Sequence, residues 1–286
     1  MKQAQAVCTR LRLASARVAA LLLVGLGAAL PACAQASLRA TFDSLQQPLA
    51  ASVFGRPLLL DSGATGADPH GDVYAVVDHR FSDVLAALQR AERWCELLVL
   101  HINVKRCTVA GAAPRQMLHV AVGRKIDQPI EDAYPVDFKY TLRSALNDHL
   151  AVSMMADNGP LGTRDYRLAL EAMPVDAKRT FIHMSYTYGS GFAARMATDA
   201  YLATVGRNKV GFSIVGHDKA GQPVYVGGVR GIAERNTMRY FLAIDAYLNG
   251  MAAPPEQRFD HHFPSTNRAG RGRRGRDARR QLSPGR

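Results

Sequence analysis

The order of hydrophobic and polar positions along the chain predicts its first elements. Apolar residues at three- and four-residue spacing predict a short amphipathic helix over 38–50. Turn-forming residues predict a loop over 63–71, and β-branched and aromatic residues predict a strand over 72–81. One helix should follow, with Ser82 as its N-cap. Its end, 94–100, is almost wholly apolar and must therefore be surrounded by protein or ligand.

The middle of the chain is a succession of alternating segments. In one of them, 137–147, the apolar residues Phe138, Tyr140 and Leu142 alternate with Lys139, Thr141 and Arg143. Such alternation is typical of antiparallel strands with one packed face and one solvent-exposed face. The predicted strands are 104–110, 116–123, 137–147, 149–156, 164–172 and 178–189.

Two helices and a hairpin are predicted after these strands. A helix over 192–205 leads into a hairpin, and a final helix covers 235–249, with Asn236 as its N-cap and Gly250 after its end. This order predicts an α+β fold, in which a curved antiparallel β-sheet carries helices on its concave face. The predicted helices are too few to fill that face completely, so we expect an internal cavity suited to apolar ligands.

The segments "GDVYAVVDHRFSDVLAALQRAERWCELLVLHINVKRC" and "GGVRGIAERNTMRYFLAIDAYL", with the strands between them, resemble the START-like (SRPBCC) helix-grip superfamily over residues 57–249. That superfamily includes lipid-transfer domains and polyketide cyclase-like proteins. The resemblance implies that a long helix grips the sheet over a ligand cavity. Members of the superfamily bind lipids, sterols or aromatic polyketides there, and some are enzymes, so the resemblance does not identify the substrate. Either 235–249 or 192–205 could be the gripping helix. We favour 235–249 because it is the more apolar.

The N-terminus indicates export. Residues 1–36 combine a basic start, a short apolar stretch and an A-x-A site, which predicts a secretory signal peptide cleaved near Ala36. The mature chain would then be periplasmic or secreted. It would consist of a helical lead-in over 37–56, a START-like domain over 57–250 and a disordered tail over 251–286.

The formal charge of +12 lies mostly at the two ends of the chain. The signal carries +4 and the Arg-rich tail +6, which leaves +2 for residues 37–250. A folded part so close to neutral argues against specific nucleic-acid binding. The tail could contact an anionic membrane surface, or it could be a solvated segment with no dedicated partner.

Cleavage near Ala36 would leave Cys95 and Cys107 as the only cysteines. Two cysteines in an oxidising compartment most often form a disulfide, which we expect here. A catalytic thiol needs an environment that lowers its pKa, and a zinc site needs further ligands at suitable spacing. The sequence shows neither, so we expect no metal and no cofactor.

Catalytic motifs are absent from the sequence: it has no H-E-x-x-H, no phosphate loop and no dinucleotide fingerprint. We therefore assign no catalytic residue. His101 and His183 could contact a ligand, act as acid or base, or be structural. The charged residues of 234–239 could hold an anionic headgroup at a cavity mouth, or pair internally and fix the start of a helix, which we favour. The predicted cavity-lining residues are Trp94, Leu98, Tyr140, Leu142, Met154, Tyr166, Leu168, His183, Met184, Tyr186 and Arg239.

The function that these features favour is an exported START-like protein that binds or carries a hydrophobic, lipid-like molecule. Two alternatives remain open. One is an enzyme of the cyclase, isomerase or hydrolase type on the same scaffold. The other is a cell-envelope interaction protein that acts through its basic tail.

Overall fold

The computed structural model describes residues 29–65, 68–126 and 128–252. An eight-stranded antiparallel sheet has the strand order β1-β2-β8-β7-β6-β5-β4-β3, and β9 and β10 form a separate hairpin. The strands are β1 (Leu58–Thr65), β2 (Asp68–Val77), β3 (Val104–Ala110), β4 (Gln116–Val122), β5 (Tyr134–Ala145), β6 (Leu150–Asn158), β7 (Thr163–Pro174), β8 (Thr180–Ser190), β9 (Ile214–His217) and β10 (Pro223–Tyr225). The helices are α2 (Ala29–Ala50), α3 (Phe81–Leu88), α4 (Ala91–Leu98), η1 (Ile130–Asp132), η2 (Pro160–Gly162), α5 (Phe192–Ala203) and α6 (Gly228–Ala252).

The six strands predicted from alternation are confirmed as β3 to β8. The loop predicted over 63–71 is wrong, because most of that segment belongs to the paired strands β1 and β2. Its glycines and its proline suggested turns. Gly71 is needed instead for close packing, since a side chain there would collide with the Thr237 hydroxyl of α6.

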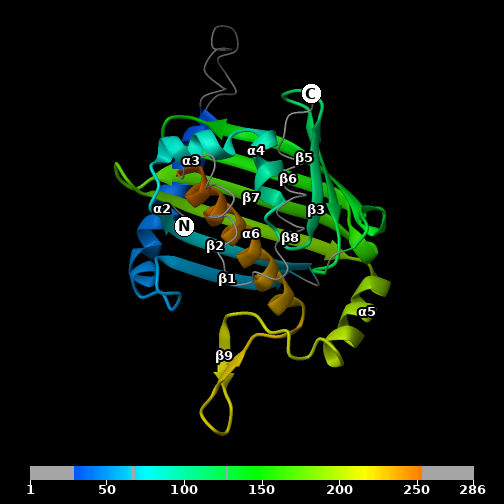
Figure 1. The fold of residues 1–286 in the computed structure, drawn as a ribbon. Coiled ribbons are helices and arrows are strands. Elements are labelled where there is room, and N and C mark those ends of the chain that lie inside the picture. The colour runs from blue at the N-terminus through cyan, green and yellow to red at the C-terminus, as the bar shows by residue number, and fades with distance from the viewer. Residues whose placement is uncertain (1–28, 66–67, 127, 253–286) are drawn as a thin grey trace, which may run out of the picture.

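The sheet curves around α6, which crosses its concave face (Figure 1). Apolar residues of α6, among them Phe241 and Ile244, are fully buried against the even-numbered residues of β8, such as Met184. The predicted α+β fold is thus confirmed, and α6 is the gripping helix. By contrast, α5 has no buried residue.

The N-terminal helix α2 lies on the opposite face of the sheet. Leu38 and Leu49 of α2 form a second buried cluster with Phe181 and its neighbours, and the rings of Phe42 and Phe181 are 4.9 Å apart. Part of the outer face is therefore covered as well. Residues 1–28 lie outside the described residues, so the signal peptide and the localisation stay predictions.

The helix predicted after β2 is in fact two helices, α3 and α4, and Ser82 is not its N-cap. Arg80 occupies the cap position without a side-chain hydrogen bond. At the break, the indole Nε1 of Trp94 donates a hydrogen bond of 2.7 Å to the Leu88 carbonyl. The apolar end of the segment is buried, as expected, and the Trp94 side chain is fully enclosed.

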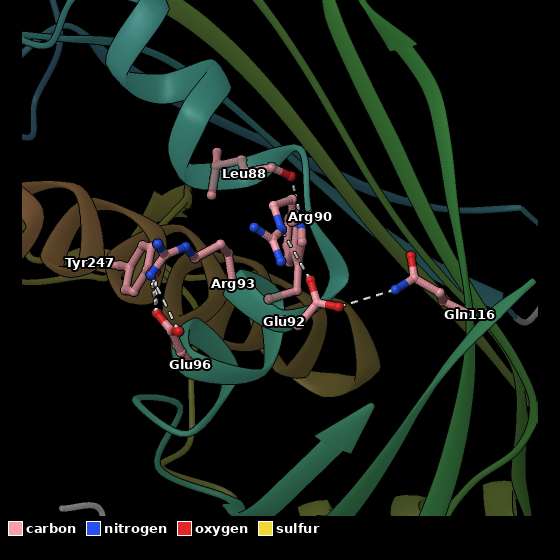
Figure 2. A network of polar contacts seen from close by, with 8 residues as sticks. Leu88, Arg90, Glu92, Arg93, Glu96, Gln116 and Tyr247 are labelled. Carbon is pink, nitrogen blue, oxygen red and sulfur yellow. Dashed lines mark hydrogen bonds and ion pairs between the residues drawn. The ribbon is translucent and has the colours of Figure 1, made fainter. Parts of the chain in front are cut away.

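The gripping helix is longer at both ends than its sequence signals indicate. It spans Gly228–Ala252, so that Asn236 and Gly250 are internal and neither is a cap. Two polar contacts fix its C-terminal half: Arg56 forms a bidentate ion pair with Asp245 at 2.8 and 2.9 Å, and the Tyr247 hydroxyl donates to Glu96 of α4 at 2.5 Å (Figure 2).

The predicted disulfide between Cys95 and Cys107 is confirmed, and it joins α4 to β3. Within the described ranges, no group of His, Cys, Asp and Glu residues could hold a metal ion. No helix in the same part of the chain is long and apolar enough to cross a membrane. Residues 253–286 of the predicted tail lie outside the described residues.

Candidate ligand-binding cavity

A cavity of about 450 Å³ lies between α6 and the sheet strands β3, β4, β5, β7 and β8. Side chains alternate along each strand, so residues of one parity point toward α6. In β4 and β5 these residues are apolar: Val120, Val136 and Phe138 line the cavity and are buried. Leu98 from the end of α4 and Ile232 from α6 complete its apolar wall.

Tyrosine rings form a second part of the wall. Tyr186 of β8 lies between Tyr166 of β7 and Tyr240 of α6, with ring centroids 6.3 and 5.2 Å apart. Burial raises the pKa of Tyr166, Tyr186 and Tyr240 above that of a free phenol. These residues therefore present neutral aromatic surface to the cavity at physiological pH.

His101, in the turn between α4 and β3, also lines the cavity. It is 6% exposed and stacks on Tyr240 with ring centroids 4.6 Å apart. The backbone amide of Asn103 donates to its Nδ1 at 3.3 Å, so the neutral ring carries its hydrogen on Nε2. Burial, and secondarily the charge of Arg239, lower the pKa of His101 to about 4. His101 is therefore neutral at pH 7.

Four cations surround one part of the cavity. Arg235 and Arg239 come from α6, Lys125 from the segment after β4 and Lys209 from the segment after α5. Burial, and then the charges of Arg239, Arg235 and Lys209, lower the pKa of Lys125. The four charges therefore act on one another, and the wall that they form is electropositive.

No protein-family model matches the chain, and no curated protein matches it. Several solved structures resemble it in part. Norcoclaurine synthase of Thalictrum flavum is 15% identical with a TM-score of 0.36, over 51% of this chain and 89% of that one. The ZhuI aromatase/cyclase of a Streptomyces species is 13% identical with a TM-score of 0.35, over 49% and 86%. A hypothetical protein of Helicobacter pylori is 12% identical with a TM-score of 0.39, over 62% and 85%.

The fold is assigned from the strand order and from the long C-terminal helix held by the curved sheet. The chain has an α+β helix-grip fold. Within this fold the cavity occupies the space between the grip helix and the strands that curve over it.

The structure brings together some of the predicted cavity residues. Leu98, Tyr166, Tyr186 and Arg239 line the cavity. Five others are buried in the same core but lie away from the cavity wall: Trp94, Tyr140, Met154, Leu168 and Met184. They belong to the packed part of the helix-grip fold, because α3, α4 and α6 fill most of the concave face.

Two predicted cavity residues lie elsewhere. Leu142 is 41% exposed, next to a register shift between β5 and β6. His183 has an odd position on β8, so its side chain points to the outer face of the sheet, whereas that of Tyr186 points to the concave face. There its Nε2 is 2.9 Å from Asp72 Oδ1, and its ring stacks on Tyr74 at 4.4 Å.

Lys125, Lys209 and Tyr201, which come from connections and from α5, also line the cavity and were not predicted. No periodic signal marks such residues, since their place at the cavity depends on how α5 and the β4–β5 connection fold back. In the charged segment 234–239, the acid pairs with no arginine among the described residues: Glu234 accepts hydrogen bonds from Ser62, Phe212 and Ser213. Glu234 fixes local structure, whereas Arg235 and Arg239 line the cavity.

Proposed function

We propose that this protein binds a small hydrophobic molecule in the cavity between α6 and the sheet, and carries it without chemical change. The cavity itself is the observation that supports this proposal. Its volume, about 450 Å³, lies in the range of roughly 300–1,000 Å³ that is typical of sites for small molecules. Its walls consist mainly of valine, leucine, phenylalanine and tyrosine side chains.

Binding would be driven by removal of apolar surface from water. At about 25 cal/mol per Å², a ligand that buries roughly 200 Å² of apolar surface gains about 5 kcal/mol before the cost of association. Hydrogen bonds from Ser62, Phe212 and Ser213 to Glu234 hold the cavity-lining part of α6 in place before a ligand arrives. A preformed site loses less entropy on binding than one that must be ordered.

Carriage is a better-supported proposal than acid–base catalysis. His183, one of the two histidines that could act as acid or base, lies on the opposite face of the sheet, paired with Asp72. His101 does line the cavity, but its pKa of about 4 makes it unprotonated at pH 7 and a weak base. The described cavity therefore lacks a histidine poised to exchange protons near neutral pH.

Export to the periplasm or the exterior is part of the proposal. The basic and apolar character of residues 1–36 supports it, as does the Cys95–Cys107 disulfide, because disulfides persist in oxidising compartments. We also propose that the Arg-rich tail contacts anionic lipid surfaces. Co-sedimentation with anionic vesicles should be lost when residues 254–286 are deleted, and unchanged co-sedimentation would rule this role out.

An uncharged fluorescent probe such as N-phenyl-1-naphthylamine tests cavity binding. The wild type should bind the probe saturably, with one site per chain. Ile232→Trp should weaken binding, because the larger side chain takes up part of the cavity. Leu242→Trp is the matched control, since Leu242 lies on the same helix, is 51% exposed and is not part of the cavity wall. Equal binding by both variants would contradict the proposal.

A further inference from the structure

The charges around the cavity are of one sign. Lys125, Lys209, Arg235 and Arg239 all line it, and its lining residues include no aspartate or glutamate. Among the described residues, none of these four cations forms an ion pair with a carboxylate. Like charges gathered at a partly buried site repel one another, so a bound anion would stabilise the arrangement.

The two arginines retain most of their hydrogen-bonding capacity. Arg239 donates one hydrogen bond, of 2.9 Å, to the Asn236 side chain. Arg235 donates one, of 3.3 Å, to the Val210 carbonyl. Each guanidinium has five N–H donors, so both can still bind an oxygen anion. Guanidinium groups suit carboxylates and phosphates because two parallel N–H bonds match two oxygens.

His101 adds an independent observation. Its Nε2 is buried at the cavity wall and has no hydrogen-bond partner. Because Nδ1 accepts a hydrogen bond from Asn103, Nε2 is a donor. A buried donor without a partner is costly, and native structures normally satisfy such groups. An oxygen of a ligand would provide the missing acceptor, and the neighbouring cations favour an oxygen that carries negative charge.

We propose that the ligand is an anionic amphiphile, whose carboxylate or phosphate group is bound by Arg239, Arg235 and Lys125 and whose apolar body lies against Val120, Val136 and Tyr186. This inference rests on the proposed function and adds the chemical class of the ligand. The apolar wall supplies affinity for any hydrophobic molecule, and the cationic part of the wall selects among them.

Competition against the uncharged probe tests the charge preference. Decanoate, decyl phosphate, decanol and decylamine share one apolar chain and differ in the head group. At low ionic strength, decanoate or decyl phosphate should displace the probe at a concentration about tenfold lower than decanol, as expected for a charge-assisted hydrogen bond. Decylamine should be the weakest competitor. Preference for only one of the two anions identifies the head group.

Variants then locate the selectivity. Arg239→Gln should reduce the advantage of the anions over decanol at least about threefold, while probe binding is retained. Lys125→Gln is a second variant, on an exposed side chain, and should have a smaller effect in the same direction. Arg167→Gln is the control, because Arg167 is exposed on β7 away from the cavity, and it should change nothing.

The outcomes separate the two proposals. If the probe binds and all four amphiphiles compete equally, cavity binding stands and the anionic preference is wrong. If the anions are preferred but Arg239→Gln, Lys125→Gln and Arg167→Gln all behave as the wild type does, the assigned site is wrong. If neither the probe nor any amphiphile binds, the proposed function itself fails, and this inference fails with it.

Discussion

Glu234 offers the sharpest test of how the grip helix is held. Its carboxylate is fully buried and accepts hydrogen bonds from the Ser62 hydroxyl at 2.5 Å and from the amides of Phe212 and Ser213 at 2.6 and 3.0 Å. It therefore ties the first turns of α6 to β1 and to the segment before β9. Arg230 extends the network by donating to the Ser62 hydroxyl at 2.8 Å.

Glu234→Ala removes the shared acceptor of three donors. Hydrogen bonds to a charged group contribute about 1.5–3 kcal/mol each. Because Phe212 and its neighbours are partly exposed, water can replace some of the lost hydrogen bonds. We therefore expect the free energy of unfolding to fall by about 3 kcal/mol. Urea denaturation followed by circular dichroism measures it. Glu131→Ala, at an exposed acid, is the control and should change stability by less than about 0.5 kcal/mol.

The same network predicts a pH dependence. Burial raises the pKa of the Glu234 carboxyl, but the hydrogen bonds from Ser62, Phe212 and Ser213 outweigh it and lower the pKa below its ordinary value. At acidic pH the native state thus binds fewer protons than the unfolded state. The contribution of the Glu234 carboxylate to the free energy of unfolding is complete above the ordinary pKa of about 4.3. It is lost as the pH falls through the folded pKa. In Glu234→Gln this decrease in the free energy of unfolding at low pH should be absent. Unchanged stability in Glu234→Ala would refute the reasoning.

Three further predictions concern the sheet and its covalent link. Reduction of the Cys95–Cys107 disulfide should lower the free energy of unfolding by about 2–4 kcal/mol in denaturant titrations with and without reductant; equal midpoints would contradict this. Gly71→Ala should cost about 1–3 kcal/mol, because the new methyl group meets Thr237, and Thr237→Ala should recover part of the loss in a double-mutant cycle. The pKa of His183 is about 9, since Asp72 and Glu171 outweigh the opposing effect of burial. Its contribution to stability should therefore be complete below about pH 6.5 and lost as the pH rises through 9. In His183→Gln the free energy of unfolding should no longer fall over this pH range. If it still falls, another group causes the pH dependence.

Period-two alternation located strands β3 to β8 correctly, because a half-buried antiparallel strand imposes that pattern on its residues. The boundaries of the helices were predicted less well. Asn236 and Gly250 have the chemistry of helix ends, yet contacts of Glu234 and Asp245 with distant segments extend α6 past both positions. Local propensity is a weak signal beside such tertiary contacts.

The site was predicted only in part. Tyr166 and Tyr186 were found because the pleat assigns a face to each strand residue. The prediction for His183 was wrong, because His183 and Tyr186 are three residues apart on β8 and so point to opposite faces of the sheet. Lys125 and Lys209 could not have been predicted, since their position at the cavity depends on how connections between distant elements fold.

Methyl-resolved NMR during titration with the uncharged probe tests most directly whether a ligand enters between α6 and the sheet. Methyl signals of Leu98, Val120 and Val136 should shift saturably, while those of Leu38 and Leu49, on the opposite face, should not. Shifts confined to exposed residues, or none at the cavity wall, would contradict the account.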